Sequence, residues 1–215
     1  EDGLNRFDGY AVTTYRHDSH DASSLPGDFV WGIAEDPAGD LWIGTDGGGL
    51  ARWERKKDRF TGYRHDPKDE GSLPSDRVRE VFVDRAGFVW VGTRGGGLAR
   101  LDRASGRFTR YGHEPGPPSS PGHDEVFAIH QSRSGDIWVG TDGGLHRLDA
   151  VKGSYQEYPG GSARQGGRNE DKIRAIEEDR EGDLWIGTLD GGLIRLRLGT
   201  GEVVRHRHDP KKPVS

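Results

Sequence analysis

One tryptophan-centred segment occurs four times along the chain at an almost constant interval. Each copy reads Gly-x-[Leu/Ile/Val]-Trp-[Ile/Val]-Gly-Thr, and the tryptophans are spaced by 48, 48 and 47 residues. They are Trp42, Trp90, Trp138 and Trp185. A fixed interval of this length indicates that each copy is one supersecondary unit, repeated along the chain. The repeat therefore constrains the fold more than any other feature of the sequence.

Each repeat carries the signals of four short strands. In the first complete copy the strands are predicted near 29–35, 40–45, 49–54 and 59–65. An Asp-x-x-Gly turn precedes the tryptophan strand in three copies, and a run of glycines follows it. The chain contains 35 glycines and 11 prolines, a composition that favours disorder unless it is periodic. Here it is periodic, which is typical of strands joined by tight turns.

Four antiparallel strands in a unit of 40 to 50 residues are the signature of a β-propeller blade. We predict an all-β propeller with four complete four-stranded blades at about 28–65, 76–113, 124–160 and 171–208. Residues 3–7 and 11–15 match the third and fourth strands, so a half blade is predicted at 1–16. The whole chain, 1–215, is then a single repeat region that forms a partial or open propeller.

Stacked blades bury each other's faces, so the four tryptophans are predicted to be core residues rather than a platform for sugars. The chain begins with Glu1 and contains no methionine, which indicates a segment of something longer.

Composition excludes several classes of function. Without cysteine the chain has no disulfides, thiolate metal sites or cysteine nucleophiles. The net charge is −5 and no basic block stands out, so nucleic acid is not an expected partner. No apolar run reaches the roughly 18 residues that span a membrane.

The pattern Asp-x-x-Gly-x-Leu-Trp-Ile-Gly-Thr-x-x-Gly-Gly-Leu-x-Arg, at 36–52 and 179–195, resembles the two-component regulator propeller repeat. The Phe-x-x-Tyr-x-His-Asp segment at 60–66 and Ser72-Leu73-Pro74 also fit. The resemblance implies a sensor module in the periplasmic, extracytoplasmic part of a bacterial inner-membrane receptor. A histidine kinase with its phosphorelay, or a diguanylate cyclase, would then be the output domain of the parent.

The resemblance also implies the partners. Several relatives respond to polysaccharide fragments, so the expected ligand is a small molecule or an oligosaccharide. The neighbouring blades and domains of the parent receptor are expected to contact the chain, and the parent could form a homodimer.

Four residues break the repeat where the turn between strands two and three meets the loops between blades. Those loops, at 16–28, 64–76, 112–124 and 159–171, differ in content while the strands repeat, which is typical of binding loops on a rigid scaffold. Guanidinium groups beside aromatic rings suit a carboxylated sugar. We therefore predict a ligand face that consists of Trp31, Arg79, Arg94 and Arg174. The alternative is that these are solvated residues at the rim of the propeller.

Other functions remain open at this point. Propellers also serve as protein–protein interaction scaffolds, and some are sialidase- or lyase-like enzymes. A glycosidase needs two opposed carboxylates, and acidic residues are too frequent here to single out a pair. We assign no catalytic residue, no cofactor and no metal site.

Four histidines occupy equivalent loops, and each is followed by an acidic residue. Because they recur in successive repeats, we expect hydrogen bonds within a turn rather than metal coordination. They are His17, His65, His113 and His208.

Overall fold

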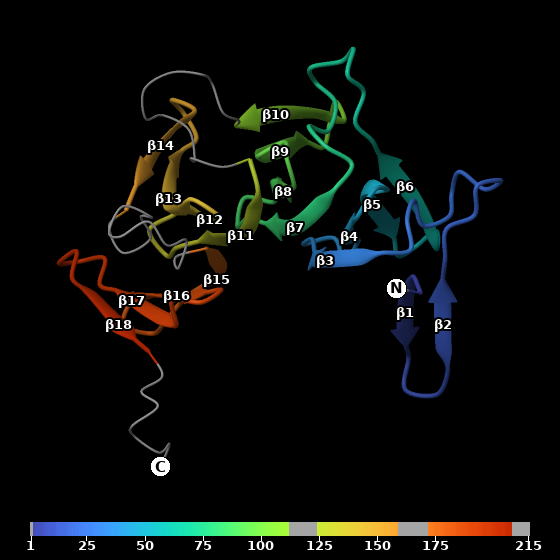
Figure 1. The fold of residues 1–215 in the computed structure, drawn as a ribbon. Coiled ribbons are helices and arrows are strands. Elements are labelled where there is room, and N and C mark those ends of the chain that lie inside the picture. The colour runs from blue at the N-terminus through green and yellow to red at the C-terminus, as the bar shows by residue number, and fades with distance from the viewer. Residues whose placement is uncertain (1, 112–123, 159–171, 208–215) are drawn as a thin grey trace. The chain divides into compact units, whose positions relative to one another are not determined.

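The computed structural model describes residues 2–111, 124–158 and 172–207, and these residues form only strands, turns and loops. Four sheets have four antiparallel strands each, and a fifth has two (Figure 1). In every four-stranded sheet the strands follow one another in sequence order. This confirms the all-β propeller with four complete blades and a half blade at the N-terminus.

The half blade contains β1 (Leu4–Phe7) and β2 (Val12–Tyr15). Blade 1 consists of β3 (Val30–Glu35), β4 (Leu41–Thr45), β5 (Gly49–Glu54) and β6 (Arg59–Tyr63). Blade 2 consists of β7 (Val78–Val83), β8 (Val89–Thr93), β9 (Leu98–Asp102) and β10 (Arg107–Tyr111). The strands of blade 1 end within two residues of their predicted bounds.

Blade 3 consists of β11 (Val126–Gln131), β12 (Ile137–Thr141), β13 (Gly144–Asp149) and β14 (Ser154–Glu157). Blade 4 consists of β15 (Ile173–Glu178), β16 (Leu184–Thr188), β17 (Leu193–Leu196) and β18 (Val203–His206). The first strand of blades 1, 2 and 4 has a register irregularity at the same place, between its first and third residues.

The described residues form two compact units. Unit 1 holds residues 2–111 and 124–126, which are the half blade, blade 1, blade 2 and the start of β11. Unit 2 holds residues 127–158 and 172–207, which are the rest of blade 3 and blade 4.

The core of each unit lies between successive blades. In unit 1, Trp42 and Leu50 of blade 1 share one buried cluster with Val78 and Val81 of blade 2. Blade packing also explains the glycine after the tryptophan, because a Cβ at Gly44 would come within 2.6 Å of Val78 Cγ1. In unit 2, Trp138 and Leu145 of blade 3 pack with Ile173 and Ile176 of blade 4. The predicted role of the tryptophans as core between blades is confirmed for Trp42 and Trp138.

The aspartate of the Asp-x-x-Gly turn holds the tryptophan strand in place. In blade 2, Trp90 Nε1 donates to Asp84 Oδ2 at 2.8 Å, while the Ala86 and Phe88 amides donate to Asp84 Oδ1 at 3.0 and 2.8 Å. Gly87 has a φ of 84°, in the left-handed region, which closes the turn. Asp36 with Trp42 and Asp179 with Trp185 repeat this arrangement at 3.1 and 2.6 Å.

Blade 3 lacks this arrangement. Ser132 takes the place of the aspartate, and the buried Trp138 Nε1 has no hydrogen-bond acceptor within the described parts of the chain. The blade still forms, so packing of the ring is sufficient for the fold and the carboxylate adds stability to it.

The histidines of the first two loops make the predicted turn hydrogen bonds. The amides of His17 and His65 donate to Asp28 Oδ1 and Asp76 Oδ1, both at 2.7 Å. Their Nδ1 atoms lie 2.9 and 2.7 Å from the carbonyl oxygens of Leu25 and Leu73. This confirms the structural role of the two residues, whereas His113 and His208 lie outside the described residues.

One carboxyl group lies on a first strand where the other blades have small residues. Glu80 of β7 is half-buried and pairs in register with Gly92 of β8. Its equivalents are Gly32, Ala128 and Ala175. Burial raises the pKa of Glu80 to about 7, because the ionised carboxylate loses hydration there.

Removal of the turn aspartate in blade 2 tests its contribution. Asp84→Ala leaves the Trp90 indole and two amides without their acceptor, and we expect a loss of about 3 kcal/mol in the free energy of unfolding. Urea denaturation followed by tryptophan fluorescence measures this loss. Asp102→Ala, at an exposed turn of the same blade, is the control and should cost less than about 1 kcal/mol. Equal losses for the two variants would contradict the proposed role.

Glu80 makes stability depend on pH. Its folded-state pKa of about 7 lies above the ordinary 4.5, so the folded chain binds the proton more tightly than the unfolded chain. The free energy of unfolding should therefore fall as pH rises from about 4.5 to 7 and stay lower above that range. Glu80→Gln should flatten this dependence and raise the Tm at pH 8, measured by thermal denaturation. Glu177→Gln, exposed on β15, is the control, and a pH profile unchanged by Glu80→Gln would refute the assignment.

Candidate functional site

In unit 1 the residue that follows the second strand of one blade contacts the residue just before the first strand of the next blade. Asp46, which follows β4, forms an isolated antiparallel bridge with Arg77, and Arg77 Nε donates to Asp46 Oδ1 at 2.8 Å. One blade later Arg94 and Glu125 occupy the same positions, with the same bridge and a 2.8 Å bond from Arg94 Nε to Glu125 Oε1. The polarity of the ion pair is reversed. The departure of Arg94 from the repeat is thus matched by a second departure at Glu125.

Trp31 and Arg79 meet across the same junction. The guanidinium carbon of Arg79 lies 4.5 Å from the centre of the Trp31 ring, which is a cation–π contact. The ring of Phe29 lies 5.1 Å from that of Trp31. Trp31 remains 45% exposed, so part of its surface is available to a ligand.

The carboxylate of Asp46 lies among the arginines of this site. The hydrogen bond from Arg77 is the main cause that holds the pKa of Asp46 below its usual value, and the charges of Arg79 and Arg94 act in the same direction. Arg94 lies beside this ion pair, because its amide donates to the carbonyl oxygen of Arg77 at 2.8 Å. The structure therefore brings Trp31, Arg79 and Arg94 together in unit 1.

Arg174 belongs to unit 2 and has its own partners there. Its guanidinium carbon lies 3.6 Å from the centre of the Phe127 ring, and both Nη atoms lie 3.1 Å from Asp142 Oδ1. Lys172 Nζ donates to Asp142 Oδ2 at 3.0 Å. Asp142 is thus neutralised by two cations, and Arg174 forms a group separate from the other three predicted residues.

The two groups are equivalent positions two blades apart. In each group an arginine lies against an aromatic ring of the preceding blade, and the basic residue just before the arginine's strand donates to an aspartate. In unit 1 the arginine and ring are Arg79 and Trp31, and the donor and aspartate are Arg77 and Asp46. In unit 2 they are Arg174 and Phe127, and Lys172 and Asp142. The repeat pattern identifies Trp31, Arg79, Arg94 and Arg174 as irregular positions, but it does not identify Phe29, Asp46, Arg77 and Glu125 as their neighbours. An alignment of alternate repeats would have shown the pattern.

The unit 1 group suits an anionic ligand better than a neutral one. The group contains the guanidinium groups of Arg77, Arg79 and Arg94, of which Arg77 and Arg94 donate to Asp46 and Glu125. Arginine presents several N–H donors in one plane and binds carboxylates in pairs of hydrogen bonds. The exposed indole beside it offers an apolar face for stacking.

The repeat matches a known family. The model of the family described as two component regulator propeller matches the chain four times, at residues 24–47, 72–95, 120–143 and 167–190. None of the curated proteins matches the sequence. No helix among the described residues has the length and apolar character needed to cross a membrane.

Solved structures share the architecture. The extracellular domain of a protein described as a hybrid two component system of B. thetaiotaomicron is 27% identical, with a TM-score of 0.80 over 95% of this chain and 27% of the other. A second such domain from the same organism is 20% identical, with a TM-score of 0.65 over 95% of this chain and 35% of the other. The chain thus spans about a third or less of the length of these relatives.

An enzyme has the same fold. Virginiamycin B lyase from Staphylococcus aureus is 17% identical, with a TM-score of 0.61 over 85% of this chain and 57% of the lyase. Identity at this level shows the fold alone. The four family matches, which coincide with the four tryptophan repeats, are more specific. The chain belongs to the two-component regulator propeller family.

Proposed function

We propose that the chain is the ligand-sensing part of a bacterial membrane-bound signalling receptor and that it lies outside the cytoplasm, on the periplasmic side of the inner membrane. The match of all four repeats to the regulator propeller family carries this proposal. The similarity to extracellular domains of hybrid two component systems supports it. The chain itself binds and does not catalyse, and the kinase or cyclase output belongs to other parts of the receptor.

The proposed ligand is an acidic oligosaccharide bound at the Trp31–Arg79 group of unit 1. The exposed face of Trp31 stacks on a sugar ring, and the arginines around Asp46 pair with the carboxylate of the sugar. Arg174 contributes a second, equivalent site in unit 2, where Phe127 takes the place of the indole.

Two alternatives make different predictions. An interaction scaffold would bind a protein partner and no glycan on an array. A lyase- or sialidase-like enzyme would turn its substrate over, whereas the sensor returns the oligosaccharide unchanged. Incubation of the chain with acidic oligosaccharides, followed by mass spectrometry, separates these two outcomes.

Substitutions in the unit 1 group test the ligand site. Isothermal titration with an oligogalacturonate, and with a neutral oligosaccharide of equal length, gives the affinities. We expect Arg79→Ala and Trp31→Ala each to weaken acidic-ligand binding about tenfold, which corresponds to about 1.4 kcal/mol. The matched control is Arg55→Ala, because Arg55 also lies against a tryptophan ring in unit 1, at 6.0 Å from Trp53. Equal binding by all three variants and the unaltered chain would overturn the assignment.

A charge exchange separates the two roles of Arg94. The double variant Arg94→Asp with Glu125→Arg keeps an ion pair between the blades, in the polarity that Asp46 and Arg77 already have. If Arg94 binds the ligand, the double variant keeps its Tm and loses several-fold in affinity. If Arg94 only joins the blades, the affinity stays the same.

A further inference from the structure

Two loops of unit 1 have the same backbone structure. The loop at 16–28 precedes blade 1, and the loop at 64–76 precedes blade 2. Asp18 N and Asp66 N donate to Ser24 Oγ and Ser72 Oγ, both at 2.9 Å. Ser24 N donates to the carbonyl of Asp21, and Ser72 N to that of Asp69, both at 3.0 Å. The two loops can therefore be compared position by position.

In blade 2 this loop binds two guanidinium groups. Arg107 Nη2 donates to Asp69 Oδ1 at 2.7 Å. Arg110 donates to the carbonyl oxygen of Ser72 at 3.1 and 3.2 Å, to that of Asp69 at 3.2 Å and to Ser72 Oγ at 3.1 Å. Both arginines come from β10, so the loop is clamped to the outer strand of its own blade.

The loop before blade 1 lacks both partners. Gly62 takes the place of Arg110, and Arg59, which takes the place of Arg107, donates instead to Glu54 Oε1 at 3.0 Å. Within the described parts of the chain, no arginine or lysine donates to Asp21 or Ser24. The acceptors that hold Arg110 in blade 2 thus have equivalents here without a cation.

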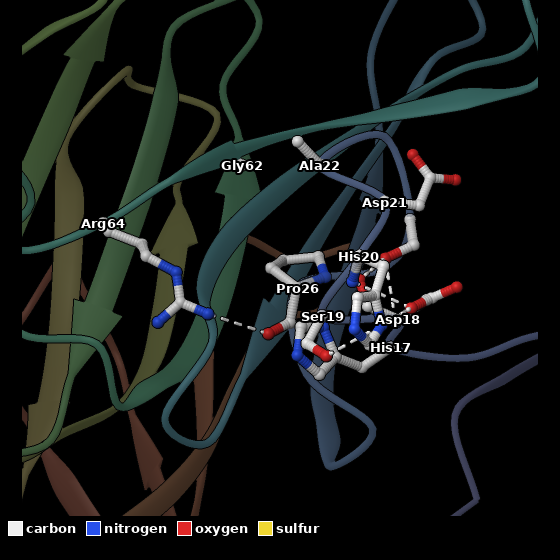
Figure 2. A pocket seen from close by; sticks show the side chains of 10 residues that line it. His17, Asp18, Ser19, His20, Asp21, Ala22, Pro26, Gly62 and Arg64 are labelled. Atoms are coloured by element: carbon white, nitrogen blue, oxygen red, sulfur yellow. Dashed lines mark hydrogen bonds and ion pairs between the residues drawn. The ribbon is translucent and has the colours of Figure 1, made fainter.

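A cavity of about 370 Å³ is lined by Gly62, the residue equivalent to Arg110, and by Asp21 and Ser24 of the loop. Its walls include Asp18, His20, Asp21, Ser24, Gly62 and Arg64. Figure 2 shows the loop residues on one side, with Gly62 on the neighbouring strand and Arg64 apart from the carboxylates. A Cβ at Gly62 would have no neighbour nearer than 3.7 Å, and the φ of Gly62 is not positive, so the backbone does not require glycine there.

The charges around the cavity favour a cation. Arg64 also lines the cavity, and its guanidinium group is held at the wall, because its Nη2 donates to the Pro26 carbonyl at 3.0 Å and its Nη1 lies 3.9 Å from Asp76. The Ser23 hydroxyl lowers the pKa of Asp21, which keeps that carboxylate ionised at neutral pH. Asp18 adds a second exposed carboxylate, close to the largely exposed ring of His20.

We propose that this cavity binds a guanidinium group, which donates to the carbonyl oxygens of Ser24 and Asp21 and to the Ser24 hydroxyl. The site goes beyond the oligosaccharide function and shares no residue with the Trp31–Arg79 group. Either site can therefore fail in experiment without the other.

The experiment uses the full chain and follows the amide resonances of Gly62, Asp21 and Ser24 by NMR during titration with methylguanidinium. We expect saturable shifts at these amides in the unaltered chain. Gly62→Arg supplies the missing arginine from within, and it should weaken methylguanidinium binding at least tenfold. Thr61→Arg adds the same charge at the neighbouring position of β6 and should leave the binding unchanged.

Thermal denaturation gives an independent measurement. Gly62→Arg should raise the Tm by roughly 2–4 °C above Gly62→Gln, which carries a shorter polar side chain without charge, because only the arginine restores the bonds made by Arg110. A Tm no higher than that of Gly62→Gln would count against the proposed acceptor set.

The source of the group is decided by two further probes. Tighter binding of N-acetyl-arginine amide than of methylguanidinium assigns the site to an arginine residue of a protein, and equal binding assigns it to a free guanidine. N-acetyl-citrulline amide, which is neutral, should not bind. The proposal is overturned if no guanidinium probe saturates the unaltered chain, or if Gly62→Arg binds the probe as well as the unaltered chain does.

Discussion

The hydrogen bond from a tryptophan indole to the aspartate of the preceding turn is the interaction that stabilises the framework of blades 1, 2 and 4. The carboxylate accepts the indole with one oxygen and the amides of its own turn with the other, so the turn and the second strand are fixed together. In blade 1, Arg103 of the following blade adds a bond of 2.7 Å to the same buried carboxylate of Asp36. One acidic residue therefore orders a turn, orients a core ring and ties two blades together.

Much of the fold could be predicted because this framework is local and repeated. Strand bounds, turns and the burial of Trp42 and Trp138 follow from a pattern that recurs in every copy. The histidine turns follow for the same reason. The site could be predicted only in part, since its contacts join residues of neighbouring blades. Nothing adjacent in the sequence links Arg94 to Glu125, and the short distance between them exists only when the blades are stacked.

Departures from the repeat fall into two physical classes. Arg94 and Glu125 exchange the charges of Asp46 and Arg77 without loss of the ion pair, so the structure compensates for the change. In blade 2 the guanidinium group of Arg110 holds the loop, whereas blade 1 has Gly62 at the equivalent position and a cavity beside it. A compensated departure preserves a junction between blades. A substitution without a matching change in its partner leaves hydrogen-bond acceptors that a ligand can use.

NMR resonances of the tryptophan indoles show directly whether each Nε1 donates to the aspartate of its turn. With each tryptophan assigned by a Trp→Phe variant, ¹H–¹⁵N spectra report the hydrogen bond at every Nε1. We expect downfield indole protons for Trp42, Trp90 and Trp185, which donate to carboxylates, and an upfield proton for Trp138, which does not. Ser132→Asp should shift the Trp138 proton downfield. Four indole protons with the same shift, unaffected by Ser132→Asp, would contradict the proposed framework.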